Sequence, residues 1–210
     1  MTEQTPACPP RRGLIVCVSG PSGVGKGTMI KKIREIDPCI AHSVSVTTRS
    51  PRPGEIEGVS YYFRNHEEFT EMLSTGEILE HDTYCGNEYG TPKTPLAGMV
   101  ERGVDVVMDI TVPGSLSVME NYPEVITVFL MPPTYSELRR RLMKRGTENE
   151  TVMEQRLKKA RDEIRQCRLF QYVVVNDDLD TAARRILGII EAERCRYSYV
   201  KGIEEQVLAL

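Results

Sequence analysis

The sequence predicts an α/β protein with a parallel sheet at its centre. Three observations support this prediction: short β-branched apolar runs recur along the chain, amphipathic helical stretches follow them, and a Gly-rich turn joins the first run to the first helix. Strands that alternate with helices need crossover connections, which bring the strands together in parallel. A length of 210 residues suits one domain with small insertions.

The predicted elements follow one another in a regular order. A helix follows the first strand as far as Pro38, another begins at Thr134, and a last helix runs through Ile186 and Ile190. Strands are expected at residues 14–18, 104–108, 125–130 and 172–176.

Two stretches do not fit this alternation. Residues 45–92 contain short strand-like pieces with frequent glycines and tyrosines, which predicts an inserted β-rich lobe. Residues 139–168 form a basic helical stretch, in which residues 147–150 offer a capping box. The stretch after Arg194 has two interpretations: it extends the last helix, or it packs against a partner chain.

The composition argues against several function classes. With 27 basic and 30 acidic residues, the net charge of −3 does not suit a protein that coats nucleic acid. No apolar run approaches the roughly 20 residues that span a bilayer, so we expect no membrane partner. The six cysteines lack CxxC spacing and the three histidines lack ligand spacing, which favours reduced thiols in the cytoplasm over a zinc site. Residues 1–13 are polar, and we expect a short disordered leader there.

A Gly-rich segment between the first strand and the first helix indicates a phosphate-binding loop. It comprises Gly20, Pro21, Ser22, Gly23, Val24, Gly25, Lys26, Gly27 and Thr28. Glycines let the backbone turn its N–H groups inward, the helix N-terminus favours anions, and Lys26 can reach the terminal phosphates of a nucleotide. Gly27 stands where the motif usually has a Mg²⁺-binding hydroxyl, and Thr28 is the nearest substitute. The alternative is a Gly-rich turn that binds no ligand.

A second candidate anion site lies in residues 43–55. Arg49 and Arg52 are three residues apart in a Pro-containing loop, and arginine binds phosphate oxygens through two parallel N–H groups. A solvated basic turn would contain the same residues. The pattern alone leaves both interpretations open.

Five segments resemble the guanylate kinases in their order and spacing: GPSGVGKGT, SVSVTTRSPRPGEIEGVSYYF, GEILEHDTYCGNEYGT, KRGTENE and VVNDDLD. The resemblance extends from about residue 14 to about residue 190, and its Thr-Thr-Arg-x-Pro-Arg-x-Gly-Glu segment is highly specific. It implies the P-loop nucleoside monophosphate kinase fold, with a parallel sheet between helices on both faces, an inserted β-rich GMP-binding lobe and a helical lid. The implied core comprises residues 14–44, 93–138 and 170–210, the lobe residues 45–92, and the lid residues 139–169.

The resemblance also implies an activity, the Mg²⁺-dependent transfer of a phosphoryl group from ATP to GMP, with dGMP as a further acceptor. The positions that correspond to the family's GMP-binding residues are Ser45, Arg49, Arg52, Tyr61, Glu80, Tyr89, Thr91 and Thr111. The two arginines and the two tyrosines would bind the phosphate. Glu80 can accept hydrogen bonds from N1–H and the 2-amino group of guanine together, and adenine offers no such donor pair.

The lid arginines of the family correspond to Arg141, Arg145 and Arg156, which with Lys26 and Arg49 are the expected catalytic residues. The adenine-contacting region corresponds to Asn176, the last expected ATP-binding residue. A basic helix is also typical of a solvated surface. That interpretation stays open for the neighbouring Arg139, Arg140, Lys158, Lys159 and Arg161.

One position departs from the family's Asp-x-Asp pattern, since Asp109 is kept but Thr111 replaces the second carboxylate. Asp109 would organise the water shell of Mg²⁺ or hold an arginine of the GMP site. Thr111 offers an oxygen without charge, so we expect a weaker hold on guanine, with Glu80 retaining the specificity.

Two other functions stay open: a non-catalytic binding module of the guanylate-kinase-like type, and a kinase for another nucleoside monophosphate, because the GKGT ending resembles adenylate kinases. The charge is uneven, with nine acidic and one basic residue in 53–91 but eleven basic and six acidic in 135–170. Such local positive charge suits an enzyme with two anionic substrates. The expected partners are small nucleotides, with the protein as a monomer or homodimer.

Overall fold

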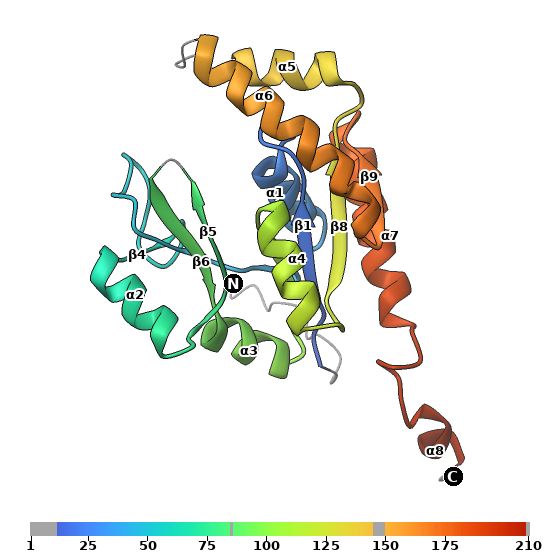
Figure 1. Cartoon of the computed structure of the whole chain (residues 1–210). Helices are drawn as coiled ribbons and strands as arrows, with labels where there is room; N and C mark the ends of the chain where they lie inside the picture. The colour runs from blue at the N-terminus through green and yellow to red at the C-terminus, as the bar shows by residue number, and fades with distance from the viewer. Residues whose placement is uncertain (1–11, 85, 145–149, 209–210) are drawn as a thin grey trace, which may run out of the picture.

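The computed structural model describes residues 12–84, 86–144 and 150–208, and a five-stranded parallel sheet lies at its centre (Figure 1). The strand order is β2-β7-β1-β8-β9. The strands are β1 (Ile15–Ser19), β2 (Ala41–His42), β7 (Val106–Asp109), β8 (Ile126–Met131) and β9 (Tyr172–Val175). Val18 pairs with Asp109 on one side and with Val128 on the other, so three strands end at the same edge. The four predicted strands are confirmed, with slightly shifted bounds.

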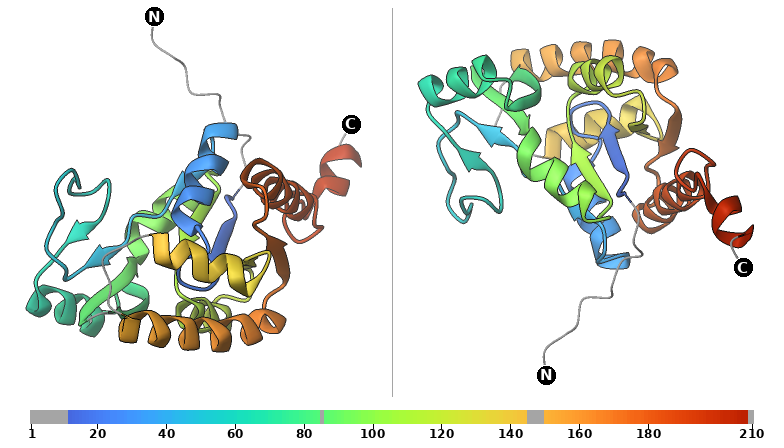
Figure 2. Two further views of the ribbon diagram at one scale, coloured as in Figure 1. Left: turned by 90° about the horizontal axis from the view of Figure 1, so that it is seen from above. Right: turned by 90° about the horizontal axis from the view of Figure 1, so that it is seen from below.

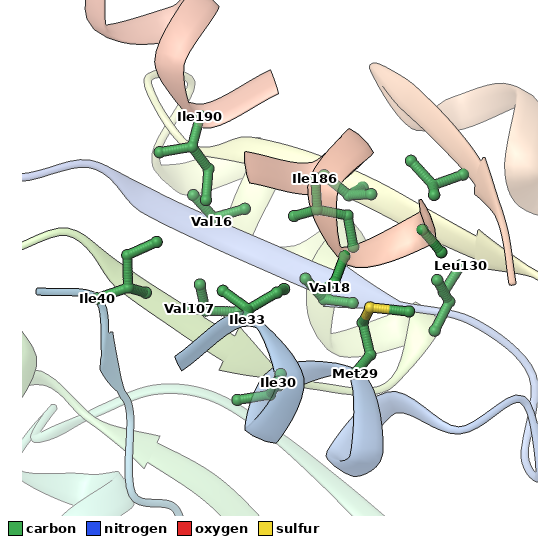
Figure 3. Close-up of a cluster of buried hydrophobic side chains, with 14 of the residues drawn as sticks. Val16, Val18, Met29, Ile30, Ile33, Ile40, Val107, Leu130, Ile186 and Ile190 are labelled. Carbon is green, nitrogen blue, oxygen red and sulfur yellow. The ribbon is translucent and has the colours of Figure 1, made fainter. Parts of the chain in front are cut away.

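Helices cover both faces of this sheet, because side chains alternate between the faces along each strand. The covering helices are α1 (Lys26–Ile36), α3 (Lys93–Glu101), α4 (Val112–Asn121) and α7 (Leu179–Arg194). Val16 and Val18 of β1 pack with Ile33 of α1 and Ile186 of α7 (Figure 3). Cys17 points the other way, into a cluster with residues of α3 and α4. Two buried apolar clusters therefore hold three layers together.

A second sheet of four strands, in the order β4-β3-β6-β5, lies beside the first (Figure 1). Its elements are β3 (Val46–Thr47), β4 (Tyr62–Phe63), α2 (His66–Ser74), β5 (Ile78–Tyr84) and β6 (Asn87–Pro92). β5 and β6 form an antiparallel hairpin, and α2 packs its buried Phe69 against Val46 and Ile78. This sheet occupies the stretch expected to be β-rich, although the sequence did not predict α2.

Two helices lie across the edge where the central strands end (Figure 1): α5 (Tyr135–Lys144) and α6 (Glu150–Arg165). They pack together through Leu138, Leu142 and Leu157. The hydroxyl of Tyr135 also donates to the carbonyl of Leu157 at 3.1 Å. A 3₁₀ turn, Gln166–Leu169, leads from α6 into β9. The predicted capping box at 147–150 lies outside the described residues.

The chain after Arg194 does not extend α7, so the first interpretation of this stretch is wrong. Cys195 caps α7, and a separate helix α8 (Ile203–Leu208) projects away from the two sheets (Figures 1 and 2). At the other end, the N–H of Gly13 donates to the carbonyl of Val100 at 2.8 Å. Residues 1–11, which belong to the expected leader, lie outside the described part of the chain. None of the described helices has the length and apolar character to cross a membrane.

Candidate active site

The Gly-rich loop lies between β1 and α1, at the edge where the parallel strands end. Gly20, Gly23 and Gly25 have φ values of +153°, +87° and +101°, which residues with side chains rarely adopt. A Cβ on Gly20 would lie 2.3 Å from the carbonyl oxygen of Leu130, so space as well as backbone angle requires glycine there. Because α1 begins at Lys26, the loop ends at a helix N-terminus, where anions are favoured.

A cavity of about 680 Å³ adjoins this loop, and both candidate anion sites line it. The loop contributes Lys26, and the segment before the second sheet contributes Arg49 and Arg52. Its other lining residues include Tyr61, Tyr89, Asp109, Thr111, Arg156, Lys159 and Glu163. A volume of this size is typical of small-molecule sites. The structure therefore brings together residues that the sequence placed in two separate anion sites.

Lys26 and Asp109 face each other in this cavity. The ammonium of Lys26 donates to the carbonyl of Gly20 at 3.1 Å. Burial raises the pKa of the Asp109 carboxyl, while the nearby Lys26 and His42 oppose the rise. A Cβ on Gly27 would lie 3.8 Å from Oδ2 of Asp109, close enough for contact only. Because Gly27 has no side chain, α1 places no side-chain atom in the space between this residue and the Asp109 carboxylate.

Thr28 does not join this group. Its side chain is exposed, and Thr28 is absent from the lining of the 680 Å³ cavity, to which the preceding Gly27 contributes. The hydroxyl expected as a substitute for the missing Ser or Thr of the motif thus lies away from Lys26. Pro21 and Val24 are buried beneath the loop, where their side chains support its shape.

Arg49 is held in place by Glu55, a residue that the sequence did not single out. Its Nη2 donates to Oε1 and Oε2 of Glu55 at 2.8 and 3.0 Å, and Oε2 also accepts from the backbone N–H of Arg52 at 2.8 Å. These contacts lower the pKa of Glu55. The guanidinium of Arg49 lies 5.4 Å from the centre of the Tyr61 ring, and the Tyr61 and Tyr89 rings lie 6.0 Å apart. The expected phosphate-binding side chains thus form one group.

A smaller cavity of about 170 Å³ contains the expected base-reading residues Ser45, Glu80 and Thr111. Glu80 is 7% exposed, and its Oε1 accepts a hydrogen bond from the hydroxyl of Thr91 at 2.7 Å. Burial raises the pKa of Glu80 to about 7, and the Thr91 hydrogen bond opposes that rise. Tyr61, Tyr89, Asp109 and Thr111 line both cavities, which therefore adjoin.

Glu80 also lies against the N-terminus of α4, on the central sheet's side of the site. A Cβ on Gly114 would lie only 2.4 Å from Oε2 of Glu80, so the glycine leaves room for the carboxylate. Thr111 caps this helix, because its hydroxyl accepts from the N–H of Gly114 at 3.2 Å. A hairpin residue and a helix N-terminus together form the pocket in which the base is expected.

Both described lid arginines contact the phosphate loop or its neighbour. Arg156 on α6 donates to the hydroxyl of Ser22 at 2.7 Å. Arg141 on α5 donates to the carbonyls of Val24 and Asn176 at 3.2 and 3.0 Å. The side-chain amide of Asn176 donates to the same Val24 carbonyl at 2.8 Å. The third expected arginine, Arg145, lies outside the described residues.

Two further residues of α6, Lys159 and Glu163, line the large cavity with Arg156. Lys159 was open to interpretation as a solvated residue, and Glu163 was not considered. Burial raises the pKa of Glu163, and Lys159 and Lys26 oppose the rise. Positions 156, 159 and 163 are spaced by three and four residues and so share one helix face. That periodicity could have identified them from the sequence.

Comparisons with known proteins point to one family. The model of the guanylate kinase family matches residues 11–193. A guanylate kinase of Lactococcus lactis subsp. lactis is 49% identical over 189 residues, which are 90% of this chain and 92% of that protein. One of Halalkalibacterium halodurans is 44% identical over 185 residues, 88% of this chain and 91% of that protein. The crystal structure of guanylate kinase from Anaplasma phagocytophilum superposes with a TM-score of 0.75 at 38% identity, covering 93% of each chain.

Proposed function

Because the chain belongs to the guanylate kinase family, we propose that it transfers the γ-phosphoryl group of ATP to GMP, giving ADP and GDP, with dGMP as a further acceptor. One observation carries the proposal: the phosphate loop and Arg49 line one cavity, and the pocket around Glu80 adjoins it. A donor nucleotide on the loop and an acceptor nucleotide in the pocket would therefore meet through their phosphates.

The reaction needs no protein base. The second pKa of a phosphate monoester is near 6, so the GMP phosphate is mostly dianionic at pH 7 and can attack directly. The protein must instead reduce the repulsion between two polyanions and align them. In this proposal Lys26 bridges the donor phosphates, Arg49 and Arg52 hold the acceptor phosphate, and Arg141 and Arg156 stabilise the group in transit.

The choice of acceptor rests on the base pocket. Glu80 would accept from N1–H and the 2-amino group of guanine, while the hydroxyls of Ser45, Thr91 and Thr111 complete the polar surroundings. Adenine would give the buried Glu80 carboxylate no donor from the base, which is a strong basis for rejection.

Mg²⁺ would be held mainly by the nucleotide phosphates, as is usual for this ion. Among the described residues no three His, Cys, Asp or Glu side chains gather as metal ligands. The residues present nevertheless fit a hydrated ion, because Asp109 offers a desolvated carboxylate beside Lys26 and Gly27 leaves space next to it. Bound there, the ion would neutralise phosphate charge, and Asp109 would orient its water shell.

The two lid helices would close the site over ATP. Leu142 packs so near Gly23 that a Cβ on this glycine would lie 2.6 Å from it, and Arg141 and Arg156 contact the same loop. Closure excludes water, which would otherwise compete as phosphoryl acceptor. The proposed division places the core at residues 14–44, 93–138 and 170–210, the lobe at 45–92 and the lid at 139–169. The proposed setting is the cytoplasm, with the protein as a monomer or homodimer.

A coupled assay of ADP release tests the proposed function, with GMP, dGMP, AMP and UMP offered as acceptors alongside ATP and Mg²⁺. We expect ADP release with the guanine nucleotides and a rate with AMP or UMP at least about a thousandfold lower. Release with AMP or UMP instead would assign another nucleoside monophosphate kinase. No release with any acceptor would favour the binding module.

A further inference from the structure

A second carboxylate, Asp82, lies in the small cavity beside Glu80 and has no assigned role. It follows Glu80 by two positions on β5, so both side chains leave the strand on the same face. Both line the 170 Å³ cavity together with Thr111. Asp82 therefore belongs to the wall of the acceptor site and not to the outer surface of the hairpin.

One oxygen of Asp82 is an acceptor without a donor. Oδ1 accepts from the backbone N–H of Thr83 at 2.8 Å, whereas Oδ2 is buried and has no hydrogen-bond partner within the described residues. Nearly all buried polar atoms in folded proteins have a partner, so an exception at a ligand cavity calls for one. The two carboxylates share one cavity, and the negative charge of Asp82 adds to the rise in the pKa of Glu80.

The position of Asp82 along the hairpin indicates which part of the nucleotide it meets. Glu80 and its partner Thr91 mark the base end of the site. Tyr89, which interacts with Arg49, marks the phosphate end. Asp82 pairs with Tyr89 across the two strands and so stands between these ends. In a nucleoside monophosphate the ribose lies between the base and the phosphate, and its hydroxyls are hydrogen-bond donors.

We propose that Asp82 accepts a hydrogen bond from the ribose 2′-hydroxyl of GMP and makes the protein prefer GMP over dGMP. This assignment rests on the proposed function and deepens it, since it names the group that distinguishes the two guanine acceptors. A carboxylate suits the task because hydrogen bonds to charged acceptors are stronger than those between neutral groups. Carboxylates contact ribose hydroxyls in the same way in dinucleotide-binding folds.

The test compares kcat/KM for GMP, dGMP and IMP in the wild-type protein, in Asp82→Asn, and in Glu67→Gln as a control. Glu67 is an exposed carboxylate of the same lobe, on the first turn of α2, away from both cavities. We expect the wild type to prefer GMP over dGMP by roughly 10- to 100-fold, the usual effect of one hydrogen bond to a charged group. Asp82→Asn should lower kcat/KM for GMP by about tenfold and leave dGMP within about twofold, and Glu67→Gln should change neither.

Several outcomes would overturn the assignment. Equal kcat/KM values for GMP and dGMP in the wild-type protein would overturn it. This comparison needs no variant, so it remains decisive if Asp82→Asn does not fold. An equal loss for GMP, dGMP and IMP would make Asp82 a structural residue. A loss for both guanine acceptors that spares IMP would move the contact to the 2-amino group of the base. If the wild type uses no acceptor at all, the proposed function itself fails, and that result is distinct from the other three.

Discussion

Arg156 donates a hydrogen bond to the hydroxyl of Ser22 at 2.7 Å, across 134 positions of the chain. The contact joins a lid helix to the phosphate loop and puts a guanidinium at the cavity where the transferred group would pass.

Replacing Arg156 by Met should lower kcat by about 100-fold, because the charge that stabilises the group in transit is lost while the apolar stem is kept. The KM for GMP should stay within about twofold. Steady-state kinetics with each substrate varied will show the split. Arg139→Met, on an exposed position of α5, is the matched control and should behave as wild type. A normal kcat for Arg156→Met would show that this arginine has no role in catalysis.

Lys26→Met should abolish measurable turnover while GMP still binds. The ammonium lies at the loop and not in the base pocket, so its loss should affect the donor phosphates and spare acceptor binding. Kinetics combined with calorimetric titration of GMP measures both. Lys31→Met, exposed on the same helix, should leave kcat unchanged. Turnover near the wild-type rate in Lys26→Met would refute the role given to Lys26.

Glu80→Gln should separate stability from function. The folded pKa of Glu80 is raised from 4.5 to about 7, so its ionisation destabilises the fold progressively between these pH values and fully above pH 7. At about 1.4 kcal/mol per pH unit, this penalty is roughly 3 kcal/mol. The variant should therefore unfold at higher urea concentration than wild type at pH 8 and at the same concentration near pH 4, while kcat/KM for GMP falls by at least about 100-fold.

The same ionisation predicts a pH dependence of catalysis. As pH falls below about 7, Glu80 in the free protein becomes protonated and loses an acceptor for guanine, so kcat/KM for GMP should fall. In the Glu80→Gln variant the fall should begin only near pH 6, where the GMP phosphate itself takes up a proton. A profile with the same fall in both proteins would assign the titration to another group.

Thr111→Asp should lower the KM for GMP several-fold, because a carboxylate would replace an uncharged acceptor beside the base. Aspartate is as good an N-cap as threonine, so α4 should keep its first turn. The measurement belongs at pH 8, where Glu80 is ionised, with Thr94→Asp on the exposed start of α3 as the control for added charge. An unchanged or higher KM would contradict the weaker hold attributed to Thr111.

Gly114→Ala should disturb Glu80 without damaging the fold. Alanine favours helices more than glycine does, but its Cβ would lie 2.4 Å from Oε2 of Glu80 and push the carboxylate away. We expect kcat/KM for GMP to fall at least about tenfold with an unchanged melting temperature. Gly188→Ala in α7, where a Cβ meets nothing within 4 Å, should not affect kinetics. Normal kinetics in Gly114→Ala would show that the pocket adapts.

The sequence predicted the parallel core well, because its strands are short apolar runs bounded by glycine and proline. It missed α2 although Asn65 and Glu68 form a capping box there. It also missed α4, whose first turn contains Pro113 and Gly114, residues that argue against a helix unless the cap at Thr111 is recognised. The sequence therefore predicted the elements whose apolar residues recur with a simple periodicity, and it missed helices whose main local signal is a cap.

The candidate site was predictable only where a motif names its members. Lys26, Arg49 and Glu80 came from such motifs, and the structure places them around adjoining cavities. The ion pair between Arg49 and Glu55 and the approach of Glu80 to Gly114 depend on how separate segments pack. No spacing in the sequence encodes those distances.

Because Gly114 has no side chain, the Glu80 carboxylate can approach the start of α4 and so lies at the contact between the two sheets. Glu80 is carried by the small sheet, whereas Gly114, which leaves room for its carboxylate, belongs to a helix on the large one. A movement of the small sheet away from the large one would therefore withdraw the Glu80 carboxylate from the end of α4. The contact that reads the base in this proposal is thus also a contact between the two sheets.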